Sequence, residues 1–364
     1  MATISSLTAR KILNSRGEWT LSVELGDEHG IRVSGSAPEG ESKGTFEAEY
    51  VKPEHAVEQV QSVVAPTLKG MDGVDQLAVD RKLVELEVGA NVSIAVSRVC
   101  ARLGAESRRM PLWKHISEIY QTKPAAPRLF INVLEGGMHA HNNLVFQEYL
   151  AIPKANTIAR SVEIGRRVYK ALRDELKADV GDEGGLVANF KDALEPLGLL
   201  GREADIDLGM DAAANNVDLP PAELFALYRQ MNLFYLEDPF KENDFENFKK
   251  LKEEMGEQSI IAGDDLTTTN LARMRKAKEE DAINGVIIKP DQIGTLTQAM
   301  EAVRQAREWG WAVVVSHRGG ETNDDFVADL AWAVAADGLK LGGLARGERI
   351  AKYNRLLAIE EDEA

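Results

Sequence analysis

Six residues with ionisable side chains each close a short apolar run in the second part of the chain. They are Asp211, Glu237, Asp264, Lys289, His317 and Lys340. If these residues face one another, the three carboxylates would repel strongly unless a cation held them together. Ligation by carboxylate oxygens suits Mg²⁺, with the remaining coordination positions left for water and substrate. A zinc site would more often recruit histidines. These residue types therefore indicate a magnesium site.

Lys289 adds a candidate base to this predicted metal site. Its amine could remove a proton if neighbouring charge and burial lowered its pKa. A divalent metal beside a substrate carboxylate would stabilise the dianion that forms when the lysine takes the adjacent α-proton. Each of these residues alone is more often a cap or a surface ion pair, so the prediction rests on their combination.

Two glutamates elsewhere stand in patterns that also have purely structural explanations. Glu183 lies in VGDEGGL, where the glycines could simply form a turn. Glu148 lies in FQEYL, which fits an alternating strand. At the level of these two motifs, the structural and the functional explanations both stay open.

The spacing of the six residues predicts the elements that position them. Successive members lie 26, 27, 25, 28 and 23 residues apart. Each interval has the length of one strand, one helix and two loops, which is the crossover that parallel strands require. A closed (β/α)-barrel built from such units would bring the strand ends together at one face. An open doubly wound sheet has similar spacing, but the sequence contains neither GxGxxG after its first strand nor GxxxxGK[ST].

A smaller α+β domain is expected before the barrel. Residues 12–33 read as strands and turns, and three later segments have apolar residues at helical spacing. These helical segments are 56–68, 74–86 and 90–102. Residues 122–128 read TKPAAPR, where two prolines disfavour both helix and central strand. We therefore place the domain boundary here, with residues 1–123 in the first domain and 124–364 in the barrel.

The composition excludes several classes of function. A net charge of −16 would repel nucleic acids and anionic membrane surfaces, so neither is an expected partner. Cys100 is the only cysteine, which excludes an intramolecular disulfide and fits a reducing compartment. No apolar run approaches the roughly 18 residues of a membrane span. A cytoplasmic protein is therefore expected.

At this point a series of ordered motifs carries a family resemblance. The motifs read ARKILNSRG, FINVLEGGMHAHNNLVFQEYLAIP, VGDEGG, GMDAA, LEDPF, AGDDLT, IIKPDQIGT, VVSHRGGET and ERIAKYNRLLAIEE. In this order they resemble the enolase family over nearly the whole chain. The resemblance implies an enolase-type barrel with a capping first domain, and the Lys-and-Mg²⁺ scheme described for the enolase superfamily.

The resemblance also implies a role for each matching residue. Lys289 would take the C2 proton of 2-phosphoglycerate, and Glu183 would assist departure of the C3 hydroxyl to give phosphoenolpyruvate, supported by Glu148. Arg318 would hold the phosphate and Lys340 the carboxylate. The other matching residues are His139 and His317 near the phosphate and hydroxyl, Gln147 and Ser42 as substrate-binding positions, and Asp211, Glu237 and Asp264 as the Mg²⁺ ligands.

A homodimer is a further implication of the resemblance. One family ion pair would join Arg10 to Glu348 of the partner subunit. A second pair is absent, because Ser22 and Ala358 stand where the family has a glutamate and an arginine. Both partners are missing together, so no charge would be left unpaired and the dimer is still expected.

Several departures from the family pattern concern the substrate clamp. The loop from Glu39 to Gly44 reads EGESKG where enolases have SGASTG, and Gly319 replaces a phosphate-binding serine. Met138 and His141 also differ from the family's histidine loop. The chain is shorter than a usual enolase. These departures leave two other readings open: a paralogue acting on a related phosphorylated or phosphonylated carboxylate, like carboxyphosphonoenolpyruvate synthase, or a non-catalytic structural or binding role.

Overall fold

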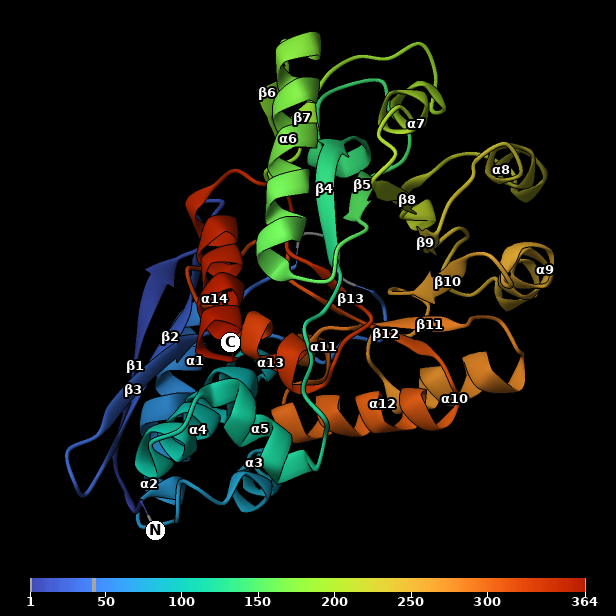
Figure 1. Cartoon of the computed structure of the whole chain (residues 1–364). Coiled ribbons are helices and arrows are strands. Elements are labelled where there is room, and N and C mark those ends of the chain that lie inside the picture. Colours follow the sequence, from blue (N-terminus) through green and yellow to red (C-terminus); the bar gives the residue numbers. More distant parts are fainter. Residues whose placement is uncertain (1, 41–43, 364) are drawn as a thin grey trace.

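The computed structural model describes residues 2–40 and 44–363 (Figure 1). The first part of the chain forms a three-stranded antiparallel sheet. The strands pair in the order β1-β2-β3. Their bounds are β1 (Ile4–Leu13), β2 (Trp19–Asp27) and β3 (Arg32–Ser36). Leu21, Val23 and Leu25 alternate along β2 and bury their side chains in the first hydrophobic core. The expected opening sheet is present, and it starts earlier than the sequence indicated.

Helices follow this sheet in the chain, and those within residues 53–68 and 90–108 pack on it. The helices are α1 (Pro53–Gln59), the π-helical turn η1 (Val60–Val64), α2 (Ala65–Leu68), α3 (Gln76–Glu85), α4 (Ala90–Arg108) and α5 (Leu112–Tyr120). The predicted helix over 56–68 is therefore interrupted by a π-helical turn. Helix α4 is buried along most of its length, because it packs on β2 and β3 and also contacts α11 and α12 of the barrel. It is the main element between the two parts of the chain.

Eight strands close into a barrel, which confirms the predicted fold class. The order β13-β12-β11-β10-β9-β8-β5-β4 closes through pairing of β13 with β4. Their bounds are β4 (Leu129–Glu135), β5 (Glu148–Pro153), β8 (Ile206–Asp211), β9 (Tyr235–Glu237), β10 (Ile260–Gly263), β11 (Gly285–Ile288), β12 (Ala312–Ser316) and β13 (Gly338–Lys340). Strand β5 runs antiparallel to both of its neighbours. The remaining pairings within the barrel are parallel.

A short hairpin extends the sheet beside β4. It consists of β6 (Asp179–Val180) and β7 (Leu186–Val187), and β7 pairs with β4 at Leu186 and Leu134. The turn of this hairpin contains Glu183. The pairing therefore brings the VGDEGG motif to the same end of the barrel as the end of β4.

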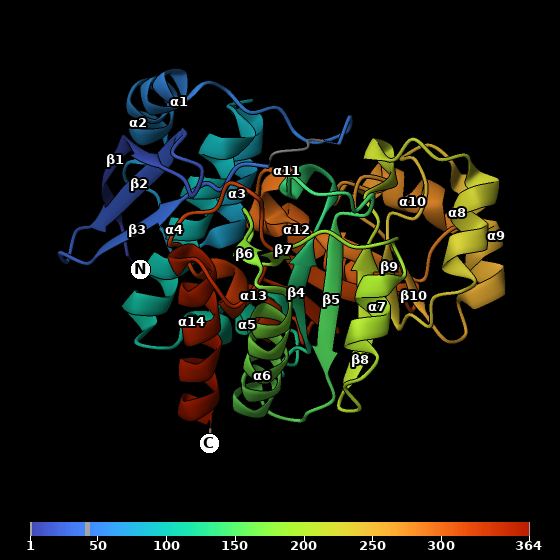
Figure 2. The ribbon, with the colours of Figure 1, turned by 90° about the horizontal axis from the view of Figure 1, so that it is seen from above.

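The outer helices alternate with the strands. They are α6 (Ile158–Leu176), α7 (Glu195–Leu200), α8 (Pro221–Tyr228), α9 (Phe245–Met255), α10 (Leu271–Glu279), α11 (Pro290–Ile293), α12 (Leu296–Glu308), α13 (Phe326–Ala333) and α14 (Gly347–Glu363). Side chains of Thr157, Asp244, Asn270 and Thr295 cap the first turns of α6, α9, α10 and α12. In Figure 2 the first sheet lies at one side of the molecule and helices α8 and α9 at the other.

Apolar side chains are buried on both faces of the barrel strands, and their alternation determines the orientation of the residues at the strand ends. On β11 and β12, Ile288 and Val315 belong to the large core beneath the outer helices, whereas Ile287 and Val314 fill the barrel interior. This alternation sets which residues face inward where the strands end. Asp211, Glu237 and Lys340 are the last residues of their strands, and Asp264, Lys289 and His317 directly follow theirs.

No helix among the described residues is long and apolar enough to cross a membrane.

Candidate active site

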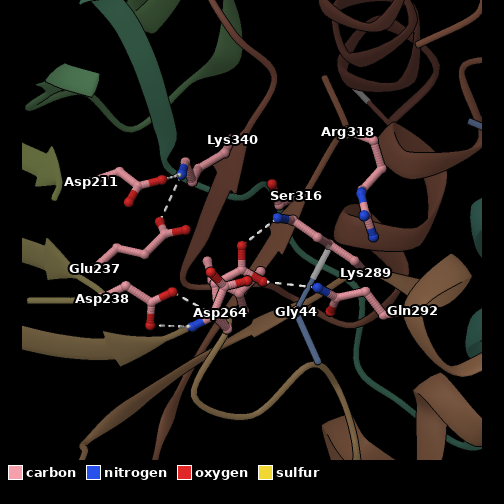
Figure 3. Close-up of polar contacts among 12 residues, drawn as sticks. Gly44, Asp211, Glu237, Asp238, Asp264, Lys289, Gln292, Ser316, Arg318 and Lys340 are labelled. Carbon is pink, nitrogen blue, oxygen red and sulfur yellow. Dashed lines mark hydrogen bonds and ion pairs between the residues drawn. The ribbon is translucent and has the colours of Figure 1, made fainter. Parts of the chain in front are cut away.

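The amine of Lys340 lies among three carboxylates at the carboxyl end of the barrel, and Figure 3 shows its contacts with two of them, Asp211 and Glu237. Its Nζ atom is 3.0 Å from Oδ2 of Asp211, 2.7 Å from Oε2 of Glu237 and 3.4 Å from Oε2 of Glu148. Glu148 can join this group because β5 is antiparallel, so its first residue lies in register with Asp211 at the end of β8. All four side chains are buried.

A second amine, that of Lys289, pairs with Asp264. Nζ of Lys289 donates to Oδ2 of Asp264, and the amide of Gln292 donates to its Oδ1 at 3.0 Å. The loop that carries Asp264 is held from behind by Asp238, whose carboxylate accepts the backbone N–H groups of Asp264 and Asp265 at 3.0 and 2.7 Å. Figure 3 shows these groups converging on one space.

Burial and like charge perturb the acids and bases of this cluster. Burial raises the pKa of Glu237 to about 8, and the negative charge of Asp211 adds to this effect. Burial alone would lower the pKa of Lys289, but the adjacent Asp264 carboxylate raises it above its usual value. The condition set for Lys289 as a base, a lowered pKa, is therefore not met in this arrangement, because the amine forms an ion pair with Asp264.

Glu183 faces two histidines on the opposite side of the site. Its carboxylate oxygens lie 3.4 Å from Nδ1 of His139 and 3.3 Å from Nε2 of His317. The buried Arg349 donates to Nδ1 of His317 at 2.7 Å. Since arginine only donates, Nδ1 must accept, and the ring proton is on Nε2, which faces Glu183. Burial lowers the pKa of His317 to about 4, so this ring is neutral near pH 7.

Arg318 lies behind the same cavity with its charge compensated. Its NH1 group donates to Oδ2 of Asp291 at 2.8 Å, and NH2 lies 3.0 Å from Oε2 of Glu47. The hydroxyl of Tyr50 also donates to Asp291. Gly40 packs against the guanidinium so closely that a Cβ there would lie 1.8 Å from NH2 of Arg318.

A small cavity lies between the site residues. About 40 Å³ remains between the predicted site residues, room for very few water molecules. Gln147 and Gly319 line it with the residues above. Glu39 and Gly320 exchange two backbone hydrogen bonds of 2.8 Å that pin the loop before Gly40. Ser42 lies outside the described residues.

A cation fits the chemistry of the acidic side of the site. Oε1 of Glu237 is buried without a hydrogen-bond partner among the described residues. A bound metal ion would give this oxygen a partner. The carboxylate oxygens of Asp211, Glu237 and Asp264 do not all lie within 4.8 Å of one another. The amines of Lys289 and Lys340 lie among these three acids. The described residues form two tighter groups of this kind: Glu148 with Glu183 and His317, and Asp238 with Asp264 and Asp265.

Several residues of the site were not identified from the sequence. They are Glu47, Glu135, Asp238, Asp291, Gln292 and Arg349. Three of them stand next to or near predicted residues, Asp238 after Glu237 and Asp291 and Gln292 after Lys289, so adjacency was an available signal. Glu47, the other partner of Arg318, and Arg349, the partner of His317, come from distant segments and gave no such signal.

Comparisons with known proteins agree along the whole chain. Residues 4–116 match the family model described as the enolase N-terminal domain, and residues 124–219 and 215–364 match that of the enolase C-terminal TIM barrel domain. Similar curated proteins, each named enolase, come from Methanopyrus kandleri, Solanum lycopersicum and Eimeria tenella. Their identities are 37%, 35% and 36%, over 100%, 100% and 99% of this chain and 96% of each relative.

Proposed function

Since the chain belongs to the enolase family and is a lyase of the phosphopyruvate hydratase type, we propose that it dehydrates 2-phosphoglycerate to phosphoenolpyruvate with Mg²⁺. The observation that carries this proposal is the convergence of Lys289, Glu183, Asp211 and Asp264 on one small cavity. Glu237 lies beside it, paired with Lys340. An amine and an acid on opposite sides of a small site suit removal of a proton and departure of a hydroxyl.

Asp211, Glu237 and Asp264 would hold the metal ion. When bound there, Mg²⁺ supplies positive charge that stabilises the carboxylate dianion formed during proton removal. The buried, unpartnered Oε1 of Glu237 supports this ligand set. Lys340 would bind the substrate carboxylate. Its ammonium group lies beside Asp211 and Glu237, and therefore next to the position proposed for the metal ion.

Lys289 would accept the C2 proton at Nζ. The amine must be neutral to do so, and therefore its ion pair with Asp264 must be broken in the active state. Glu183 would then deliver a proton to the departing C3 hydroxyl. Although burial opposes it, His139 and His317 hold the pKa of this carboxyl well below its usual value, so Glu183 must first take up that proton when substrate is bound. His317 presents its Nε2 proton to Glu183 and so helps to orient the carboxyl group, while His139 and Glu148 line the same side.

The phosphate would meet Arg318. Asp291 and Glu47 already accept hydrogen bonds from both terminal nitrogens of this arginine. This pairing, together with Gly319 in place of a hydroxyl donor, favours one second candidate: a paralogue that acts on a related phosphorylated or phosphonylated carboxylate.

The enolase candidate and the paralogue candidate would use the same residues to remove the α-proton. They would differ in how Arg318 and the residues around it bind the phosphate or phosphonate group. A linked assay with 2-phosphoglycerate and Mg²⁺ tests the first candidate. Turnover that disappears in Lys289→Ala supports it. Metal-dependent stabilisation of the protein without any turnover of 2-phosphoglycerate supports the paralogue, and absence of both effects favours a structural role.

Location, assembly and domain boundary complete the proposal. The single cysteine, Cys100, is buried and free, which supports a cytoplasmic location. We propose a homodimer in which Arg10 meets Glu348 of the partner subunit. We place the boundary between capping domain and barrel in the segment between α5, which ends at Tyr120, and β4, which begins at Leu129.

A further inference from the structure

The carboxyl group of Glu135 lies inside the turn that carries Glu183. Glu135 is the last residue of β4 and is fully buried. Its Oε1 atom accepts the backbone N–H of Glu183 at 3.1 Å and that of Gly185 at 2.6 Å. The side-chain amide of Asn132 lies 3.4 Å from the same oxygen. One carboxyl oxygen therefore ties the backbone of the proposed acid to the end of a barrel strand.

The turn is shaped around this carboxyl group. A Cβ at Gly181 would lie 1.9 Å from Oε2 of Glu135, and a Cβ at Gly185 would lie 2.7 Å from its Cγ. Both positions therefore need glycine because the Glu135 side chain fills the space where their side chains would be. The turn closes on itself through a 2.8 Å hydrogen bond from Gly181 N to Gly185 O.

The side chain of Glu183 has weaker restraints than its backbone. Its contacts to His139 and His317 are 3.4 and 3.3 Å long, which is beyond the usual length of a hydrogen bond. The short contacts in this region are those of the turn with Glu135. A shift of the turn would therefore move the carboxyl group of Glu183 relative to the cavity.

We propose that Glu135 is a positioning residue that holds Glu183 where it can protonate the leaving hydroxyl, an inference that rests on the proposed function. Its effect is specific to elimination, because Glu135 contacts the turn of Glu183 and not Lys289. Burial, with a further contribution from the negative charge of Glu183, raises the pKa of Glu135 to about 8. The neutral acid therefore predominates at pH 7, and glutamine is a close mimic of it.

Measuring two reactions of one substrate separates this role from a general structural one. We would follow exchange of the α-proton of 2-phosphoglycerate with deuterated solvent, which reports on Lys289, and formation of phosphoenolpyruvate, which also requires Glu183. In Glu135→Ala, elimination should fall about 100-fold while exchange stays within about threefold of wild type. Glu135→Gln keeps an oxygen acceptor in place and should restore elimination to within about threefold of wild type.

Asp80→Ala is the matched control. Asp80 is also a buried acid that accepts a backbone N–H, that of Thr297, but it lies between α3 and α12, away from the site. This variant should keep the wild-type ratio of the two reactions. If Glu135→Ala does not fold, Glu135→Asp gives the same test. The aspartate side chain is one methylene group shorter, so its carboxyl group is withdrawn from the N–H groups of Glu183 and Gly185. We expect this variant to lose elimination about tenfold with exchange intact.

Equal loss of exchange and elimination in the Glu135 variants, or full elimination in Glu135→Ala, would overturn the positioning role. A wild-type protein that catalyses neither reaction would contradict the proposed function itself, and this inference with it.

Discussion

Two buried lysines neutralise most of the acidic charge in the proposed metal site. Lys340 pairs with Asp211 and Glu237, and Lys289 pairs with Asp264. Unpaired carboxylates at this depth would be strongly destabilising, so the two amines offset a large part of that cost. Because Asp264 is both a proposed metal ligand and the partner of Lys289, we expect metal binding to be coupled to the charge state of the proposed base.

Replacement of one ligand tests the metal site at the level of single residues. Asp264→Ala should abolish the Mg²⁺-dependent rise in melting temperature, because two remaining carboxylates would leave the ion poorly ligated. Differential scanning calorimetry with and without Mg²⁺ measures the shift. Asp337→Ala is the control, since Asp337 lies just before β13, at the opposite end of the barrel from the site. An unchanged metal-dependent shift in Asp264→Ala would exclude Asp264 from the ligand set.

The sequence identified strand-end residues well but not their partners. Asp211, Glu237 and Lys340 lie at the strand ends as expected, because a repeat of parallel strands and helices brings equivalent positions together. Glu47, one of the two acids on Arg318, could not be found in this way. Glu47 is 271 residues away from Arg318 in the sequence, and an ion pair across such a separation depends on the packing of both domains.

At the scale of elements, one reversed strand decides where Glu148 lies. Strand β5 pairs antiparallel with β4 and β8, so its first residue and the last residue of β8 meet at the same end of the barrel. The alternation in FQEYL indicated a strand but contained no signal for its direction. The regular spacing begins only at β8, and therefore the order and direction of the earlier strands could not be predicted from it.

A partly buried ion pair connects the first sheet and α4 to the loop before α13. Arg102 donates to both carboxylate oxygens of Asp324 at 2.7 and 2.9 Å, and Asp324 also accepts from the backbone N–H of Ser36. Although burial opposes it, Arg102 holds the pKa of Asp324 well below its usual value. These contacts fix the first domain over the mouth of the barrel.

Removal of this pair should destabilise the protein. Asp324→Ala should lower the free energy of unfolding by about 1.5 to 3 kcal/mol, because Arg102 loses two charge-assisted hydrogen bonds while keeping its contact with Asp325. Asp325→Ala is the control, since Asp325 is more exposed and makes one contact with the same arginine. Urea denaturation measures both. A loss in Asp324→Ala no larger than in the control would contradict the role of the pair.

The same residue predicts a dependence on pH. A carboxyl group with a lowered folded-state pKa stabilises the protein above its unfolded pKa of about 4, and this stabilisation is lost as the pH falls below that value. The difference in stability between wild type and Asp324→Asn should therefore shrink between pH 5 and pH 3. A constant difference over this range would contradict the assignment.

At the scale of the whole molecule, the first domain and the barrel each have their own hydrophobic core. Contacts between these two parts hold the first domain beside the site. The first core lies between the opening sheet and its helices, and the large core lies between the barrel and its outer helices. Arg10 is exposed on the outer surface of β1, where a second subunit could reach it. The composition predicted an acidic globular protein, but the assembly of two such chains depends on surface complementarity that no pattern specifies.

The proposed homodimer gives a prediction at this scale. Sedimentation at micromolar concentration should report twice the mass of one chain, and the dimer should respond only weakly to salt because one family ion pair is absent. Arg10→Ala should weaken the dimer by about tenfold, which corresponds to about 1.4 kcal/mol. Arg32→Ala, another exposed arginine of the same sheet, should not. A monomeric wild type would refute the dimer, and unaltered affinity in Arg10→Ala would refute the pairing.

The central claim is that Lys289 removes the α-proton and Glu183 completes the elimination. Hydrogen–deuterium exchange at C2 of 2-phosphoglycerate, measured by NMR beside the formation of phosphoenolpyruvate, tests this division most directly. Lys289→Ala should lose both exchange and elimination, whereas Glu183→Gln should retain exchange and lose elimination by at least about 100-fold. Exchange that persists in Lys289→Ala, or that disappears together with elimination in Glu183→Gln, would contradict the assignment of a separate base and acid.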